Sequence, residues 1–170
     1  MKVYDVNKMS SDIFIDNFKN IFEKTSSIAI SSEKMRPFKN KNHLIGIFIN
    51  EFDNLNIDTK KIIIKNHPDL GIKFKINNHL TEMSKNEQKN ADLDSCTELE
   101  FLLFNQLNNE FKSKFDIPFI FAVKGKNKSI IIDEFKRRLQ NDTIEKELEE
   151  SIKQVKQIAY FRLNEIIDEQ

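Results

Sequence analysis

Two short stretches of this chain combine residue types that can do acid–base chemistry. Residues 67–71 read HPDLG, and residues 84–88 read SKNEQ. A proline disfavours the α conformation in the residue before it, so His67 is expected where a helix ends. An imidazole titrates near neutral pH, and one that lies near a carboxylate such as Glu87 is suited to act as a general acid or base.

Each of these residues also has a purely structural explanation. A lone histidine at a helix end is stabilised by the helix dipole, and this is the better interpretation of His67 from the residues alone. The spacing Ser84-x-x-Glu87 is that of a capping box, in which both side chains satisfy amides at a helix N-terminus. Capping is therefore the better interpretation of Ser84 and Glu87 when nothing but the local pattern is considered.

Arg162 is a further candidate, because it is a charged residue on the apolar face of the predicted C-terminal helix. The apolar residues that share its face are Leu148, Ile152, Val155, Ala159 and Ile166. Burying an unpaired charge is costly, so the guanidinium needs an ion-pair partner in the fold or an anionic or carbonyl-rich ligand. Alternatively, the arginine lies at the margin of the apolar face and its stem carries the charge out to solvent. Since methionine fills a similar volume and favours helix, we expect Arg162→Met to fold about as stably as the wild type.

The elements that position these residues are expected to be helices. The chain has few glycines and prolines, and its apolar spacing is mostly helical. The predicted helices are one that carries Phe14 to Phe22 behind caps at 10–12, then 43–52 and 58–66, and further helices that open at Ser84, Thr97, Ser129 and 141–143. Residues 117–123 are the one strand-like run, which we interpret as an extended buried segment because a lone strand has no partner. The sequence thus predicts an all-α, single-domain helical bundle over residues 1–170.

Composition excludes several classes of function. The 27 basic and 27 acidic residues balance, which gives no electrostatic case for binding nucleic acid or an anionic membrane. Cys96 is the single cysteine, which excludes an internal disulfide and a CxxC metal site. No apolar run is fit for a signal peptide or a membrane span. We therefore expect a soluble, cytoplasmic protein with no nucleic-acid or membrane partner.

Four motifs together resemble the 2-oxo-4-hydroxy-4-carboxy-5-ureidoimidazoline (OHCU) decarboxylase family. They are HPDLG at 67–71, S-x-x-E-Q at 84–88, FDIPFI at 115–120 and Arg162-Leu163, and the resemblance runs from about Phe14 to Ile167. It implies an all-α enzyme with a small-molecule substrate, a carboxy-lyase that converts OHCU to (S)-allantoin in urate degradation. A homodimer is the expected assembly.

The resemblance also assigns roles to residues. His67 is implied to be catalytic and to be held by Glu87. The implied substrate-binding residues are Pro68, Ser84, Gln88, Phe119, Ile120, Phe121 and Arg162, with backbone amides of the 119–121 segment at the substrate ring. The ring C=N of OHCU accepts the electrons that departing CO₂ leaves behind, so we expect no cofactor and no metal.

The chain departs from the family pattern in two places. Family members usually carry a motif that ends in Ser-Pro-Trp, where this chain has FEKTSS at 22–27, and Asp92 stands where a glycine is common. His43 and His79 match no family site and are interpreted as ordinary polar positions. The alternatives to this decarboxylase are a non-catalytic helical ligand-binding module on the same fold and a decarboxylase of a related ureido acid.

Overall fold

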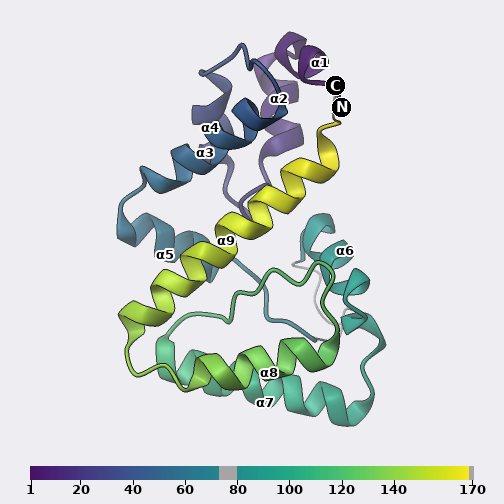
Figure 1. The fold of residues 1–170 in the computed structure, drawn as a ribbon, viewed down its shortest axis with the longest axis vertical. Coiled ribbons are helices and arrows are strands. Elements are labelled where there is room, and N and C mark those ends of the chain that lie inside the picture. Colours follow the sequence, from purple (N-terminus) through teal and green to yellow (C-terminus); the bar gives the residue numbers. More distant parts are fainter. Residues whose placement is uncertain (73–79, 169–170) are drawn as a thin grey trace. The chain divides into compact units, whose positions relative to one another are not determined.

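The computed structural model describes residues 1–72 and 80–168, and every regular element within these ranges is a helix (Figure 1). The elements follow in the order α1 (Val3–Lys8), α2 (Ser11–Phe18), α3 (Ser26–Glu33), α4 (Lys41–Asp53), α5 (Ile57–Lys65), α6 (Glu82–Asn90), the short 3₁₀ helix η2 (Leu93–Ser95), α7 (Glu98–Phe115), α8 (Lys128–Leu139) and α9 (Ile144–Ile166). The all-α fold class predicted from the sequence is confirmed. His79 lies outside the described residues.

The chain divides into two compact units. The terminal unit comprises Met1–Ile63 and Lys156–Gln170, and the central unit comprises Ile64–Val155. Helices α5 and α9 each contribute residues to both units. The single domain expected over residues 1–170 stays a prediction. None of the described helices has the length and apolar character that crossing a membrane requires.

The terminal unit has a core of stacked phenylalanine rings. Phe14 and Phe18 on α2 lie with their ring centroids 4.5 Å apart, and Phe18 lies 5.5 Å from Phe48 on α4. Phe22 stacks on Phe52 at 4.9 Å, although α2 ends before it. These rings are buried, and such offset pairs add to the free energy gained by removing apolar surface from water. The terminal unit therefore has a hydrophobic core of its own.

The central unit has a second phenylalanine cluster, built mainly by α7 and α8, which contact each other. Phe119 stacks on Phe135 of α8 with centroids 3.6 Å apart and meets Phe111 of α7 edge-on at 5.2 Å. Phe119 belongs to the connection between these helices, and residues 118–123 of that connection have no regular secondary structure. The segment predicted at 117–123 is thus anchored in the core by an aromatic ring.

Several helix starts agree with the sequence signals. Ser10 accepts from the backbone of Ile13 at the start of α2, and Thr97, where a helix was predicted to open, forms a capping box with Glu100 at the start of α7. Glu100 also accepts from Lys128, and the hydrogen bond from the Thr97 backbone N–H is the largest cause of the lowered pKa of its carboxyl. Helices α1 and α3 were not predicted, because both are short and lack a clear apolar period.

Candidate active site

His67 lies just beyond the end of α5, as Pro68 predicts. Its backbone N–H donates to the carbonyl of Ile64 at 3.1 Å, which closes the last turn of the helix. The His67 residue is 8% exposed, whereas Pro68 is half-buried. The histidine is thus held in a mostly buried position at the start of an irregular segment.

Two side-chain amides hold the backbone that follows His67. Gln88 on α6 accepts from the N–H of Gly71 through its Oε1 atom and donates to the carbonyl of Asp69 through Nε2, both at 3.1 Å. Asn108 on α7 donates through Nδ2 to the carbonyl of Leu70 at 2.8 Å. Gln88 and Asn108 are 2% and 1% exposed. Since buried backbone groups must be paired, these two amides fix the path of residues 69–71.

The glycine of the HPDLG motif is required by backbone geometry and by packing. Gly71 has φ of +69°, a conformation that residues with a side chain rarely adopt. A Cβ atom placed on Gly71 would lie 2.5 Å from Cγ of Phe104, a buried ring of α7. The HPDLG segment can therefore pass close to α7 only with glycine at this position.

Helix α6 corrects the capping interpretation of Ser84 and Glu87. The N-cap is Thr81, whose hydroxyl accepts from the backbone N–H of Ser84 at 3.2 Å. Ser84 therefore lies inside the first turn, is buried, and does not start the helix. Glu87 lies nearly a turn further along and is half-buried. A capping box between Ser84 and Glu87 is wrong, because the helix begins earlier than the sequence pattern predicted.

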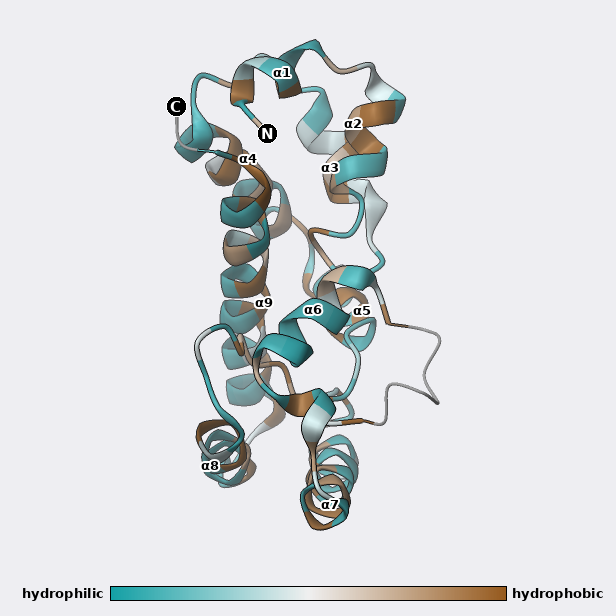
Figure 2. Cartoon of the chain, turned by 90° about the vertical axis from the view of Figure 1, so that its right-hand side faces the viewer, coloured by the Kyte–Doolittle hydropathy of each residue, from teal (hydrophilic) through white to brown (hydrophobic). Residues whose placement is uncertain are grey.

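The composition of α6 is unusual for a helix that has buried residues. Most of it has the hydrophilic colour in Figure 2, yet it buries the polar residues Ser84 and Gln88. Buried polar side chains need hydrogen-bond partners, and for Gln88 these are the backbone groups of HPDLG. The buried face of α6 is thus suited to polar recognition more than to apolar packing.

His67 also lines a pocket of ≈ 340 Å³ in the central unit. The lining residues are Lys65, His67, Asp69, Lys112, Asp116, Ile117 and Pro118. Two ion pairs border it, one from Lys65 to Asp116 at 2.7 Å and one from Lys112 to Asp69 at 2.6 Å. The hydrogen bond from Lys65 lowers the pKa of the Asp116 carboxyl. The volume falls in the range of small-molecule sites.

The 118–121 segment lies partly in this pocket and partly in the core. Pro118 lines the pocket, whereas Phe119 and Ile120 are 1% and 2% exposed. Phe121 is half-buried between buried neighbours. The structure therefore places Pro118 in the same pocket as His67. The side chains of Phe119 and Ile120 lie in the hydrophobic core, so these two residues can contact a ligand only through their backbone groups.

Arg162 lies on α9 in the terminal unit, where it forms a buried ion pair. Its Nη2 atom is 3.0 Å from Oε2 of Glu23, and the two side chains are 2% and 0% exposed. Nη1 donates to the carbonyl of Asn20 at 2.8 Å and to that of Ile21 at 3.4 Å. The ion-pair alternative raised by the sequence is thus present. Glu23 was missed as its partner, because the pairing joins residues far apart in the chain.

Comparison with known proteins agrees with the motifs. A family model described as OHCU decarboxylase matches residues 7–164. The chain is 32% identical over 163 residues to 2-oxo-4-hydroxy-4-carboxy-5-ureidoimidazoline decarboxylase of Xenopus laevis, covering 96% of this chain and 93% of that protein. It is 34% identical over 169 residues to the uric acid degradation bifunctional protein of Bacillus sp. (strain TB-90), of which it spans 33% while 99% of this chain is covered.

The chain belongs to the OHCU decarboxylase family. The family predicted from the sequence is therefore confirmed. A solved structure described as OHCU decarboxylase in the presence of (S)-allantoin has a TM-score of 0.72 at 20% identity, covering 89% of this chain and 96% of that one. A second, described as (S)-allantoin synthase, has a TM-score of 0.78 at 23% identity and covers 99% of this chain and 55% of that one. Both share the fold.

Within the OHCU decarboxylase family, Asp92 is a departure that the backbone explains. Its φ is +57°, in the left-handed region where glycine is favoured and where aspartate is one of the better-tolerated substitutes. The 3₁₀ helix η2 follows directly. Asp92 can therefore adopt the left-handed backbone conformation that a glycine at this position would favour.

We now expect Arg162→Met to destabilise the protein, which reverses the expectation from the sequence. The substitution leaves the carboxylate of Glu23 buried without its ion-pair partner, which costs about 3–5 kcal/mol. Chemical denaturation of the wild type and the variant measures the free energy of unfolding. The double variant Arg162→Met/Glu23→Gln should recover most of the loss, because no charge is then buried.

Lys156→Met is the matched control for Arg162→Met. Lys156 lies on the same helix and pairs with Asp53 at 2.7 Å, but the two side chains are 35% and 42% exposed. Its removal should cost less than about 1 kcal/mol. An Arg162→Met variant as stable as this control would contradict the structural role assigned to the ion pair.

Proposed function

We propose that this chain catalyses the decarboxylation of OHCU to (S)-allantoin without a cofactor, as a step of urate degradation. The named activity of relatives that the chain covers over most of their length supports this, including the Xenopus laevis enzyme and one from Mus musculus at 32% identity. The observation that carries the proposal is the position of His67, which lines a pocket while the loop after it is held by Gln88 and Asn108.

The reaction removes CO₂ from the ring carbon that bears the hydroxyl group and adds a proton to the neighbouring ring carbon, which bears the ureido group. The bond between the first carbon and the carboxylate breaks, CO₂ leaves, and the electron pair forms a C=C bond between the two carbons as the adjacent C=N accepts electrons. An acid then protonates the ureido-bearing carbon while the hydroxyl loses its proton and becomes a carbonyl, which gives (S)-allantoin. Because the substrate accepts its own electrons, the protein has to orient the ring, exclude water and deliver the proton to one face.

His67 is the group that we assign to proton transfer or to stabilising the developing charge. A mostly buried imidazole whose backbone is fixed can hold one orientation toward a ligand in the pocket. Glu87 is assigned to hold the imidazole in that orientation. Its position inside α6, away from the capped end, is compatible with this role because Thr81 already provides the cap.

We assign substrate contacts to the remaining predicted site residues, and the structure bears on each of them differently. Ser84 is buried on the polar face of α6. Gln88 holds the HPDLG backbone with Oε1 and with Nε2, so its second Nε2 hydrogen is the group assigned to the ureido group of the substrate. Pro68 and the backbone of 119–121 complete the set. Arg162 is retained as a predicted substrate contact in addition to its ion pair with Glu23.

We also propose a homodimer in the cytoplasm, for which the family resemblance and the composition give the support. The proposal adds no residue to the candidate site. Light scattering over a range of protein concentrations measures the assembly, and a monomer at every concentration would contradict it.

We expect His67→Asn to abolish turnover while the protein stays folded. Asparagine can donate hydrogen bonds but cannot exchange a proton near neutral pH, so kcat should fall by about 100-fold or more. The assay follows the decay of freshly generated OHCU, with circular dichroism to check the fold. His43→Asn is the control, because His43 lies on α4 and its Nδ1 accepts from the backbone of Lys39. Activity of His67→Asn within a few-fold of the control would rule out the catalytic role.

We expect Glu87→Gln to reduce kcat by about tenfold or more and to leave the unfolding midpoint nearly unchanged. Glutamine keeps the size of the side chain but not the charge that orients the imidazole. The same assay and a thermal melt measure the two effects. Glu82→Gln is the control on the same helix, since Glu82 is exposed and pairs with Lys85. Equal activity of both variants would leave Glu87 without a catalytic role.

A further inference from the structure

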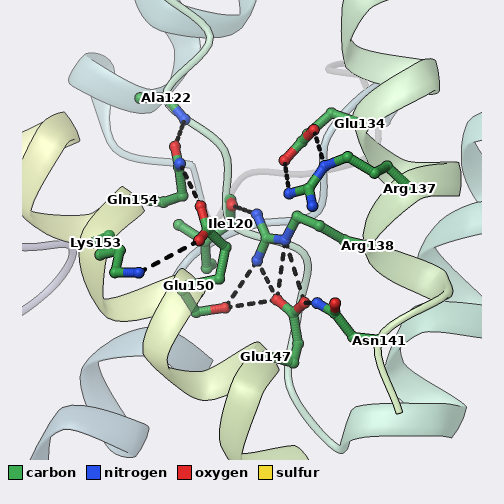
Figure 3. A network of polar contacts seen from close by, with 11 residues as sticks. Ile120, Ala122, Glu134, Arg137, Arg138, Asn141, Glu147, Glu150, Lys153 and Gln154 are labelled. Carbon is green, nitrogen blue, oxygen red and sulfur yellow. Dashed lines mark hydrogen bonds and ion pairs between the residues drawn. The ribbon is translucent and has the colours of Figure 1, made fainter. Parts of the chain in front are cut away.

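Arg138 on α8 is a fully buried arginine that the chemistry described so far does not use (Figure 3). Its Nε atom donates to the carboxylate of Glu147 on α9 at 3.1 Å and 3.3 Å, and Nη2 donates to the same carboxylate. Ser151 and Asn141 also contact this cluster, with Asn141 Nδ2 2.8 Å from Glu147 Oε2. Glu147 is as buried as Arg138. The charges are thus paired and enclosed.

A gain in the stability of the fold does not by itself explain why these charges are buried. Removing two charges from water is expensive, and apolar residues of similar volume often replace a buried ion pair at no loss. A role in fixing one particular conformation is the better explanation for a network in which every charged group has several partners. The cluster should therefore be judged by the part of the chain that it holds in place.

The cluster holds the segment that connects α7 and α8. Arg138 Nη1 donates to the carbonyl of Ile120, and the guanidinium lies over the ring of Phe119, with Cζ 4.6 Å from its centroid. Two residues further on, the N–H of Ala122 donates to Oε1 of Gln154 on α9 at 3.0 Å. Figure 3 shows the hydrogen bonds at Ile120 and at Ala122. The segment is thus held on both sides of Phe121.

The hydrogen bonds at Ile120 and Ala122 determine where the N–H and C=O groups of Phe121 point. In a trans peptide the N–H points opposite to the C=O of the same unit. Since the carbonyl of Ile120 points to Arg138, the N–H of Phe121 points away from it. Since the N–H of Ala122 points to Gln154, the carbonyl of Phe121 points away from that side chain. Phe121 is also half-buried between the buried residues Ile120 and Ala122.

We propose that Arg138, supported by Glu147, is a positioning residue that directs the backbone N–H of Phe121 toward the substrate. The inference rests on the proposed function, in which backbone groups of 119–121 contact the ring. Arg138 itself touches no substrate. It acts by donating a hydrogen bond to the carbonyl of Ile120, which fixes one peptide plane. Gln154 fixes the next peptide plane by accepting from the N–H of Ala122.

The test is the double variant Arg138→Met/Glu147→Gln. It removes both buried charges, while glutamine can still accept from Asn141 and Ser151, so the protein should stay folded. The melting temperature should fall only modestly, because the buried carbonyl of Ile120 loses its donor. The kcat/KM for OHCU should fall by about 100-fold, because small misplacements of orienting groups have effects of this size. The amide resonance of Phe121, which should shift when (S)-allantoin is added to the wild type, should no longer do so.

Arg137→Met is the matched control. Arg137 is the neighbouring residue on α8, and it pairs with Glu134 at 2.7 Å with 58% of its own side chain exposed. Its kcat/KM and its Phe121 resonance should match those of the wild type. A folded double variant with wild-type kcat/KM and a wild-type shift at Phe121 would overturn the inference.

Two further outcomes are also decisive. If the double variant does not fold, Gln154→Met removes the contact to Ala122 together with the hydrogen bond from Gln154 to the half-buried Glu150 on the same helix, and a fall of about tenfold in kcat/KM with an altered Phe121 shift would support the inference. Unchanged values in Gln154→Met would overturn it. Absence of OHCU turnover by the wild type would instead overturn the proposed function on which the inference rests, so the two failures are distinguishable.

Discussion

Backbone groups in irregular, buried chain have to find hydrogen-bond partners outside any helix ladder, and this constraint organises the central unit. Residues 69–71 obtain their partners from Gln88 on α6 and Asn108 on α7. Residues 120 and 122 obtain theirs from Arg138 on α8 and Gln154 on α9. The two segments that carry the proposed chemistry are therefore fixed by polar side chains that project from four helices.

In this arrangement, polar residues predicted to contact a ligand also have structural partners in the interior. Gln88 was predicted as a substrate contact, and in the structure it first holds the backbone of the HPDLG motif. Arg162 was predicted to face a ligand, and it pairs with the buried Glu23. A role in structure and a role in binding are compatible, because a group that positions substrate must itself be held in place.

Much of the fold could be predicted from the sequence, because it depends on local signals. Apolar periodicity and caps such as Thr97 gave most of the helices, and Pro68 gave the end of α5. Short helices with weak periodicity, such as α3, were missed. The start of α6 was misplaced because Thr81 and Ser84 are both acceptable N-cap residues, and only the backbone distinguishes them.

The candidate site was less accessible to sequence reasoning, because its supports are contacts between distant residues. The family motifs predicted His67 and Glu87 as site residues, but no local pattern pairs Arg162 with Glu23, and none joins Asn108 to Leu70. Arg138 gave no signal at all, since one arginine among basic neighbours on a helix is normally an exposed residue. Its partner Glu147 lies beyond the helix end, at the start of α9.

Native-state hydrogen exchange of two backbone amides tests most directly whether side chains hold these segments. The N–H of Gly71 donates to Gln88 and the N–H of Ala122 donates to Gln154, so each should exchange about as slowly as the amides of α7, which open only when the unit unfolds. Exchange of both amides as fast as that of exposed turn residues such as Gly125 would contradict the account, because the segments would then open without loss of the surrounding helices.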